Sequence, residues 1–405
     1  MFQKILSRFS NSNKKIIKYI PYGRQNITRS DVRAVKNILK NKNLTQGEQV
    51  PLFESEINRT VDSKYSVAVN SGTSALHIAC LALNLQVEDY LWTSPISFVA
   101  SANCGLYCRA KIDFVDINIS TGLIDIDKLK DKLENSKKIG QLPKILVCVH
   151  LAGTSCEMKS IHNLSIEYGF KIIEDASHAL GGFYNQMPVG NCKYSDITVF
   201  SFHPVKIITT AEGGVATTNN IEIFEKMKLL RSHYIEKNKK KFLSDDYGLW
   251  TYEQQGLGFN YRMNDIQAAL GISQLKRLSK IVKKRNQILN FYKKNLNLDE
   301  ISFLEIPENI QSSVHLVVIL FKKIPKESYK KIFTKLRSLN IGVQLHYFPI
   351  HLQPYFKNLG FKEGDFPSSE EYSKRAISIP VFENLKINEM KYVLKQLNNI
   401  CDEFY

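Results

Sequence analysis

The sequence predicts an α/β fold with a mainly parallel sheet in a large domain and a smaller C-terminal α+β domain. The 405 residues are enough for two domains with sizeable cores. Short apolar runs alternate with helical patterns from about residue 67, which is typical of a parallel sheet covered by helices on both faces. Near Asn264 this alternation gives way to longer helical patterns. We therefore expect a basic tail at 1–19, a large domain at 20–263, and a linking helix with the small domain at 264–405.

The N-terminal residues 1–19 are rich in Lys, Asn and Ser. They predict a flexible tail, with a short amphipathic helix on a membrane surface as the alternative. The first helix is expected from Thr28, because Thr28 and Asp31 have the spacing of a capping box. One face of this helix carries apolar side chains, namely Val32, Val35, Ile38 and Leu39.

The alternation that follows predicts seven further elements and one turn. In order they are a strand at 67–69, a turn at 71–74, a helix at 75–83, strands at 112–117 and 145–149, a helix at 158–168, and strands at 170–173 and 197–202. Gly169 is expected to end the helix before it. Asn264 is expected to cap a long helix that continues through Ile281. The small domain is predicted to contain a strand at 314–321, a helix at 328–339 and a last helix around 390–397.

The composition excludes several classes of protein. The chain is 43% hydrophobic and 23% charged, as is usual for globular proteins, and no apolar run approaches the roughly 18 residues of a membrane span. The net charge of +16 comes from lysines spread along the whole chain, so we expect no nucleic-acid partner but an attraction for anionic small substrates. The N-terminus does not resemble a signal peptide. The seven scattered cysteines predict reduced thiols in the cytoplasm and no metal site.

Two motifs point to the chemistry. The segment 172–181 (IIEDASHALG) puts Asp175 at the end of an apolar run, and the segment 201–206 (SFHPVK) ends in Lys206. A buried lysine loses charge and becomes a nucleophilic amine. A carboxylate at a strand end can keep a pyridine nitrogen protonated. Taken singly, Lys206 could be a surface lysine and Asp175 a helix cap; together they predict catalytic residues that hold pyridoxal phosphate, with Lys206 as its Schiff-base lysine.

A phosphate site is predicted from small polar residues nearby. The turn at 70–75 (NSGTSA) joins a strand to a helix, whose first amides can bind phosphate, and Ser201 lies five residues before Lys206. Phe98 follows an apolar run and could stack on the cofactor ring or belong to the core. His178 could lie beside the ring or be an ordinary half-buried histidine. Asn260 could reach a phosphate in a neighbouring subunit or cap a helix.

The chain resembles the sugar aminotransferases of the DegT/DnrJ/EryC1/StrS family. The resemblance covers nearly everything after about residue 20. It is carried by the motifs at 174–181, 201–206, 209–214, 260–264 and 379–380. It implies the type I pyridoxal phosphate fold of the aspartate aminotransferase kind, pyridoxal 5′-phosphate as cofactor, and a homodimer with active sites at the subunit interface.

Within the family, the chain looks most like the branch that serves pseudaminic acid biosynthesis. The segments behind this similarity are 20–25, 44–47, 94–100 and 210–212. It implies amino transfer from L-glutamate to C4 of a UDP-linked 2-acetamido-2,6-dideoxy-4-hexulose. The alternatives are a transaminase for a bacillosamine-type UDP-sugar or a perosamine-type sugar, and a regulator that binds pyridoxal phosphate without catalysis.

The resemblance also implies roles for individual residues. The cofactor contacts would be made by Thr73, Ser74, Phe98, Asp175, His178, Ser201, Lys206 and, from the partner subunit, Asn260. The substrate contacts would be made by Tyr22, Thr45, Gln46, Gly47, Arg231, His346 and Tyr347.

Three positions bear on how far the resemblance reaches. A sugar-dehydrating branch of the family has histidine in place of the lysine, so Lys206 favours amino transfer. Many relatives have glycine where Ala211 stands, and relatives usually have glycine where Tyr234 stands. Because Tyr234 is expected near the sugar nucleotide, this departure bears on which sugar is bound.

Overall fold

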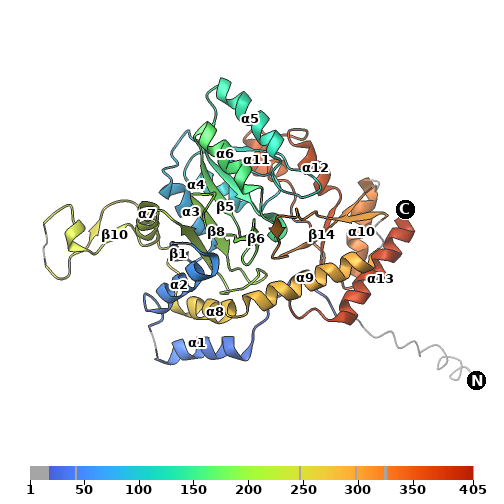
Figure 1. The fold of residues 1–405 in the computed structure, drawn as a ribbon, viewed down its shortest axis with the longest axis horizontal. Helices are drawn as coiled ribbons and strands as arrows, with labels where there is room; N and C mark the ends of the chain where they lie inside the picture. The colour runs from blue at the N-terminus through green and yellow to red at the C-terminus, as the bar shows by residue number, and fades with distance from the viewer. Residues whose placement is uncertain (1–17, 42, 246–247, 297–298, 323–325, 405) are drawn as a thin grey trace, which may run out of the picture.

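A seven-stranded sheet forms the centre of the computed structural model, which describes residues 18–41, 43–245, 248–296, 299–322 and 326–404 (Figure 1). In spatial order its strands are β1 (Tyr65–Val69), β9 (Gly214–Thr218), β8 (Ile197–Ser201), β5 (Lys171–Asp175), β4 (Pro143–Val149), β2 (Tyr90–Thr93) and β3 (Lys111–Phe114). Only β9 runs against the others, so the mainly parallel sheet expected from the alternating pattern is confirmed.

Helices cover both faces of this sheet. Successive residues of a strand point to opposite faces. Ile145 and Val147 of β4 thus pack on the side of α3 (Gly72–Ala82), α4 (Ala100–Tyr107) and α7 (Ile221–Arg231). Leu146 and Cys148 pack on the side of α5 (Ile126–Lys138) and α6 (Met158–Tyr168). At the β1 end, a further cluster joins the sheet to α2 (Gln49–Val61) and α8 (Asp265–Leu275), and α1 (Arg29–Asn41) packs on α8.

The C-terminal part is built on a three-stranded antiparallel sheet. Its strands are β12 (Ile301–Phe303), β14 (Val317–Phe321) and β15 (Ala376–Ile379). Its core is shared with α9 (Leu278–Asn295), α10 (Lys326–Ser338) and α13 (Ile387–Phe404). α8 and α9 follow one another through the lower half of Figure 1, above α1, and connect this part to the large sheet. Ile20, at the other end of the chain, bridges to Ile341 and is buried in this C-terminal core.

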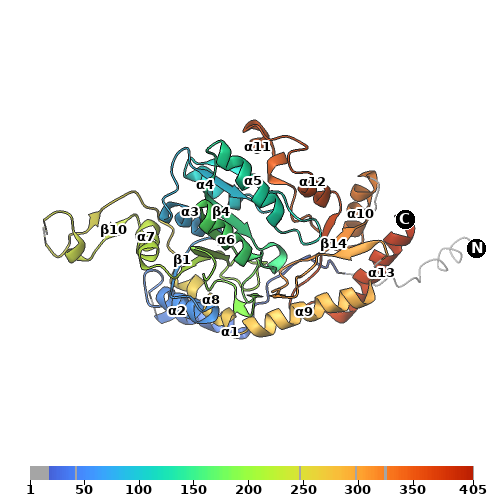
Figure 2. The ribbon, with the colours of Figure 1, turned by 45° about the horizontal axis from the view of Figure 1, so that its top comes forward.

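The remaining elements are short. They are η3 (Leu151–Gly153), β6 (Phe183–Tyr184), β7 (Met187–Pro188), β10 (Ile235–Glu236), η4 (Lys239–Lys241), β11 (Glu253–Gln254), β13 (Ile310–Gln311), η5 (Ile350–Leu352), α11 (Pro354–Asn358) and α12 (Pro367–Ser373). The β10–β11 hairpin forms an arm that stands away from the rest of the molecule in both ribbon views (Figure 2).

Local capping patterns predicted helix ends well. Thr28 and Asp31 form the expected capping box, with the Thr28 N–H donating to Asp31 at 2.7 Å. α6 has the predicted bounds, and Gly169 ends it in the left-handed region at φ 78°. Asn264 caps α8 through the N–H of Gln267.

Four expectations about elements need correction. The helix after Asn264 is two helices, because Arg277 leaves helical geometry at φ −110°, where Asp31 and Glu383 each hold its guanidinium at 3.1 Å. The turn expected at 71–74 is mostly helical, because α3 already starts at Gly72, with Ser71 as its cap. The strand expected at 112–117 ends at Phe114 in β3. The strand expected at 314–321 starts only at Val317, because Val314 turns the chain at φ 53°.

The predicted tail at 1–19 lies almost entirely outside the described residues, and the domain boundaries stay a prediction. Among the helices within the described ranges, none is both long and apolar enough to cross a membrane. All seven cysteines of the chain are free and buried.

Candidate active site

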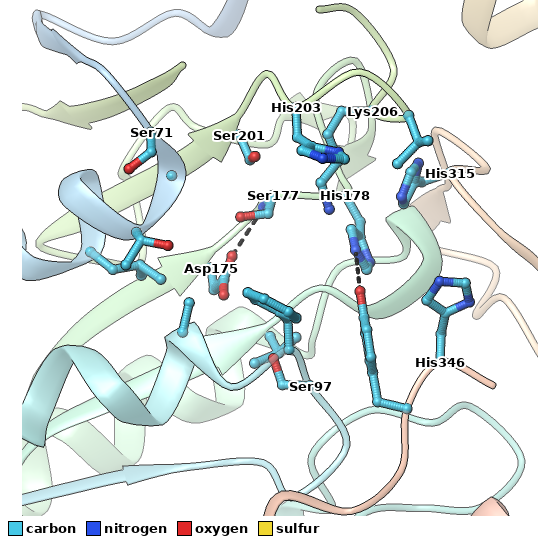
Figure 3. Close-up of a pocket in the computed structure, with 18 of the residues that line it drawn as sticks. Ser71, Ser97, Asp175, Ser177, His178, Ser201, His203, Lys206, His315 and His346 are labelled. Atoms are coloured by element: carbon cyan, nitrogen blue, oxygen red, sulfur yellow. Dashed lines mark hydrogen bonds between the residues drawn. The ribbon is translucent and has the colours of Figure 1, made fainter. Parts of the chain in front are cut away.

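A cavity of about 430 Å³ opens where the carboxyl ends of the parallel strands meet (Figure 3). Val149 ends β4, Asp175 ends β5 and Ser201 ends β8, and all three line it. Parallel strands bring their carboxyl ends to the same edge of a sheet, which is where open α/β sheets bind ligands. A volume of this size suits a small organic ligand.

Lys206 reaches the cavity from a closed turn after β8. The N–H of Phe202 donates to Gly213 at 2.9 Å, and the N–H of Thr210 donates back to Phe202 at 3.0 Å, so residues 202–210 form a loop with Lys206 near its tip. Burial lowers the pKa of the Lys206 amine to about 8, although the negative charge of Asp175 works against this. A far larger share of the amine is therefore neutral and nucleophilic than for a surface lysine.

The lowered pKa leads to a prediction about cofactor capture by the apoprotein. Only the neutral amine attacks an aldehyde, so the rate of capture of pyridoxal phosphate should rise about tenfold per pH unit below pH 8 and level off above it. Stopped-flow absorbance of apoprotein mixed with the cofactor measures this rate. A rate that still climbs through pH 10 would show an ordinary lysine and contradict the site geometry.

The Asp175 carboxylate is fixed by two donors from different elements. The Ser177 N–H donates to Oδ1 at 3.2 Å, and the Ser101 hydroxyl of α4 donates to Oδ2 at 2.6 Å. Asp175 is 7% exposed and faces the cavity across from Lys206. This arrangement presents a carboxylate in a defined orientation toward whatever occupies the cavity.

Glu174, next in the chain, points to the opposite face, as expected for adjacent strand residues. His150 donates to it at 2.7 Å, and the hydroxyls of Ser195 and Thr198 donate at 2.5 and 3.0 Å. Burial opposes a charge here, but these donors hold the pKa of Glu174 below its usual range. Glu174 is thus part of the fold beneath the site and not part of the cavity wall.

The start of α3 and Ser201 lie next to each other at the cavity, where the sequence predicts a phosphate site, and are called the phosphate cup below. Ser71 caps the helix by accepting from the Ser74 N–H at 3.1 Å, and Thr73 and Ser201 line the cavity. A Cβ on Gly72 would come within 2.9 Å of the Ser201 side chain, so the absence of a side chain lets the helix start approach the end of β8. Ser74, which was predicted to contact the phosphate, does not line the cavity formed by the described residues. Its buried hydroxyl instead donates to the Asn70 side chain at 2.7 Å.

Three histidines and a tyrosine form the wall opposite the phosphate cup (Figure 3). The Tyr347 hydroxyl lies 3.1 Å from His178 Nε2, and the His315 ring lies 4.3 Å from the His178 ring. Burial first, and the nearby Lys206 second, lower the pKa of His178, while burial lowers that of His346 to about 3. These imidazoles are therefore neutral at physiological pH and can serve as hydrogen-bonding groups.

Two predicted aromatic contacts also lie on the cavity. Phe98 is 59% exposed at its edge, 6.4 Å from the Tyr347 ring, and its face is accessible to a planar ligand. The Tyr22 ring lies 5.1 Å from the His346 ring, on the same wall. The site therefore has flat apolar surfaces as well as polar groups.

Besides Ser74, five residues of the predicted site are not brought to this cavity within the described chain. The loop of Thr45, Gln46 and Gly47 lies against α8, where the Gly47 N–H donates to Asp265 at 2.9 Å. The Arg231 guanidinium donates to the Glu54 carboxylate at 2.5 Å and to the Ala68 carbonyl at 2.9 Å. Its charge is therefore neutralised inside the subunit. Asn260 is exposed and pairs with Ser232, away from the cavity.

The backbone explains why relatives have glycine at the positions of Ala211 and Tyr234. Ala211 lies at φ 67° and Tyr234 at φ 59°, in the left-handed region that glycine adopts without strain. Tyr234 packs on Gly256 at the base of the β10–β11 arm, since a Cβ there would meet the tyrosine ring at 2.9 Å. Neither departure changes the cavity wall formed by the described residues.

Sequence reasoning missed several residues that the structure places at the site. They are Ser71, Ser97, Ser101, Ser177, His203, Glu212 and His315. Ser177 and His203 stand inside the recognised motifs and could have been chosen from them. In the sequence, His315 is distinguished only by its place at the start of an apolar run. It lines the cavity because the backbone turns at Val314, just before it.

These residues fit pyridoxal phosphate on the grounds of their chemistry. A lysine with a lowered pKa can bond the aldehyde, and an oriented carboxylate can pair with the ring nitrogen. A helix start with two hydroxyl residues suits the phosphate. The buried Nδ1 of His178 has no hydrogen-bond partner among the described residues.

Comparisons with known proteins show which family the chain matches. Residues 25–398 match the model of the DegT/DnrJ/EryC1/StrS aminotransferase family. A UDP-4-amino-4,6-dideoxy-N-acetyl-beta-L-altrosamine transaminase from Campylobacter jejuni is 38% identical over 387 residues, which are 95% of this chain and 98% of that protein.

Solved structures give the same result. Helicobacter pylori PseC, an aminotransferase of pseudaminic acid biosynthesis, matches with a TM-score of 0.86 and 33% identity, covering 96% of this chain and all of that one. The PMP-form of a sugar aminotransferase, Spr1654, from Streptococcus pneumoniae matches with a TM-score of 0.86 and 25% identity, covering 95% of this chain and 99% of that one.

Proposed function

Because this chain belongs to the DegT/DnrJ/EryC1/StrS aminotransferase family and is a pyridoxal phosphate-dependent sugar aminotransferase, we propose that it aminates C4 of a UDP-linked 2-acetamido-2,6-dideoxy-4-hexulose. L-glutamate is the proposed donor and the amino sugar is proposed to enter pseudaminic acid biosynthesis. The observation that carries the chemistry is the cavity in which Lys206 and Asp175 face each other. The choice of sugar is supported by the two named relatives above, which share a third or more of their residues with almost the whole chain.

When bound, pyridoxal phosphate draws electrons away from the carbon that loses its proton. Lys206 accepts the proton from the α-carbon of the donor in one half-reaction and returns a proton to C4 of the sugar in the other. Its pKa of about 8 suits both roles near neutral pH. Amino transfer balances because one water is consumed when the donor leaves as its 2-oxo acid, and one water is released when the nitrogen replaces the 4-keto oxygen of the sugar.

The other residues hold the reactants in place. With the cofactor bound, Asp175 would keep a proton on the ring nitrogen, Thr73 and Ser201 would hold the phosphate with the first amides of α3, and Phe98 would pack on the ring; all four residues line the cavity. His178 and Tyr347, hydrogen-bonded to each other, line the opposite wall. In the proposal, Tyr22, His346 and Tyr347 contact the sugar nucleotide from this subunit.

A homodimer completes the proposed site. The Thr45–Gly47 loop and Asn260 lie away from the cavity of their own subunit and have exposed side chains or backbone, which supports a role in a partner subunit's site. Arg231 is left out of the proposed substrate contacts because Glu54 already neutralises it. We place the reaction in the cytoplasm, where reduced thiols such as the seven free cysteines persist.

A panel of 4-keto nucleotide-sugars tests the proposal. The purified protein with L-glutamate should turn over the UDP-2-acetamido-2,6-dideoxy-4-hexulose with a kcat/KM about tenfold or more above that for GDP- or dTDP-linked 4-keto hexoses. NMR of the product gives the configuration at C4 and separates this product from a bacillosamine-type one. Preference for another sugar would contradict the proposal, and cofactor binding without conversion of glutamate would indicate a regulator.

A further inference from the structure

A buried serine on α4 contacts the Asp175 carboxylate from behind. Ser101 is completely buried, and its hydroxyl donates to Asp175 Oδ2 at 2.6 Å. It does not belong to the wall of the cavity formed by the described residues, so it touches the site only through Asp175. Hydrogen bonds to a charged group are stronger than those between neutral groups.

Ser97 completes this contact. Its hydroxyl oxygen lies 2.6 Å from that of Ser101. The Ser101 proton is directed to Asp175, since a carboxylate oxygen accepts, so Ser97 must donate to Ser101. The result is a chain of two hydroxyls from the β2–α4 segment that ends on the carboxylate.

The two linked hydroxyls hold Oδ2 of the Asp175 carboxylate, while the Ser177 N–H donates to Oδ1 at 3.2 Å. One donor comes from α4 and the other from the turn after β5, so rotation of the carboxylate would break one of the two bonds. A carboxylate that must face a ring nitrogen depends on such an orientation, because hydrogen bonds weaken steeply with angle.

We propose that Ser101 is a positioning residue that sets the orientation of Asp175 toward the pyridine nitrogen of the cofactor, with Ser97 supporting it. The inference deepens the proposed function and rests on it for the identity of the cofactor-dependent reaction. Ser101 acts through Asp175 and has no contact with the reactants.

The chain contains a matched control. Ser369 is completely buried, as Ser101 is, and its hydroxyl donates to Asp116 Oδ1 at 2.6 Å. Asp116 and Asp175 are both 7% exposed. Neither Ser369 nor Asp116 is among the described residues of the cavity wall, so Ser369→Ala removes the same kind of bond away from the chemistry.

The experiment compares Ser101→Ala, Ser97→Ala and Ser369→Ala in the full-length protein loaded with ¹⁵N-labelled pyridoxal phosphate. Solid-state NMR of the ring nitrogen reports whether it carries a proton, and the glutamate half-reaction gives kcat and KM. In Ser101→Ala we expect the ring-nitrogen signal to move toward the unprotonated position and kcat to fall on the order of tenfold, with KM nearly unchanged. Ser97→Ala should shift the ring-nitrogen signal and lower kcat in the same direction as Ser101→Ala, but by less.

The proposal is overturned if Ser101→Ala matches Ser369→Ala in both the ring-nitrogen signal and kcat. A merely structural role would lower the stability of both variants alike and leave the signal in place. The NMR signal requires neither donor nor sugar. A wrong choice of sugar under the proposed function would therefore show in the substrate panel and leave this comparison readable.

Discussion

Replacement of Lys206 by alanine is expected to reduce turnover by on the order of 10⁴-fold or more, since the proposed function assigns both the bond to the cofactor and the proton transfer to this one amine. The loss should affect both half-reactions, because Lys206 is proposed to act on the donor and on the sugar. The visible absorption of the bound cofactor should also change to that of the free aldehyde. Asp175 and the phosphate cup remain, so weaker non-covalent binding should persist.

Steady-state kinetics and absorbance spectra of the purified variant measure this effect. Lys193→Ala serves as the control, because Lys193 is exposed on the chain segment before β8 and should leave both readouts unchanged. Turnover by Lys206→Ala within tenfold of the natural protein would exclude Lys206 as the catalytic base.

Replacement of His150 by alanine is expected to cost about 3–5 kcal/mol in the free energy of unfolding, because a buried carboxylate loses its principal partner. The Cys156 N–H donates to His150 Nδ1 at 3.2 Å, so Nε2 carries the proton and donates it to Glu174 at 2.7 Å. His150 is fully buried and Glu174 is 5% exposed, so water does not readily replace the lost donor.

Urea denaturation gives the unfolding free energies. The double variant His150→Ala with Glu174→Ala should be destabilised by less than the sum of the single variants, since the buried charge is then absent. Arg59→Ala, in an exposed pair where Arg59 is 72% exposed, should change stability little. A loss for His150→Ala as small as that for Arg59→Ala would show that the buried contact contributes little.

The parts of the fold that depend on local sequence were predictable. The bounds of α6, its glycine cap and the capping box of α8 follow from side chains within a turn of each helix end. The strand that ends at Asp175 was predictable because it is an apolar run, and the turn that carries Lys206 was predictable because it follows one. Phe98, Thr73 and His178 were also placed correctly at the cavity.

The parts that depend on distant contacts were not predictable. Arg277 divides one helical pattern into two because carboxylates at positions 31 and 383 hold it. His315 enters the cavity through a turn in what reads as a continuous strand, and Ser101 meets Asp175 from 74 positions away in the chain. Arg231 likewise forms its ion pair with Glu54, a residue 177 positions away in the chain.

Reduction of the loaded protein with borohydride, followed by peptide mapping by mass spectrometry, tests the central claim most directly. The reagent fixes the cofactor permanently to the amine that holds it. The structure predicts the label on the single peptide that contains Lys206, with none on other lysines. A label on another lysine, or a protein that takes up no label, would contradict the assignment of this cavity as the active site.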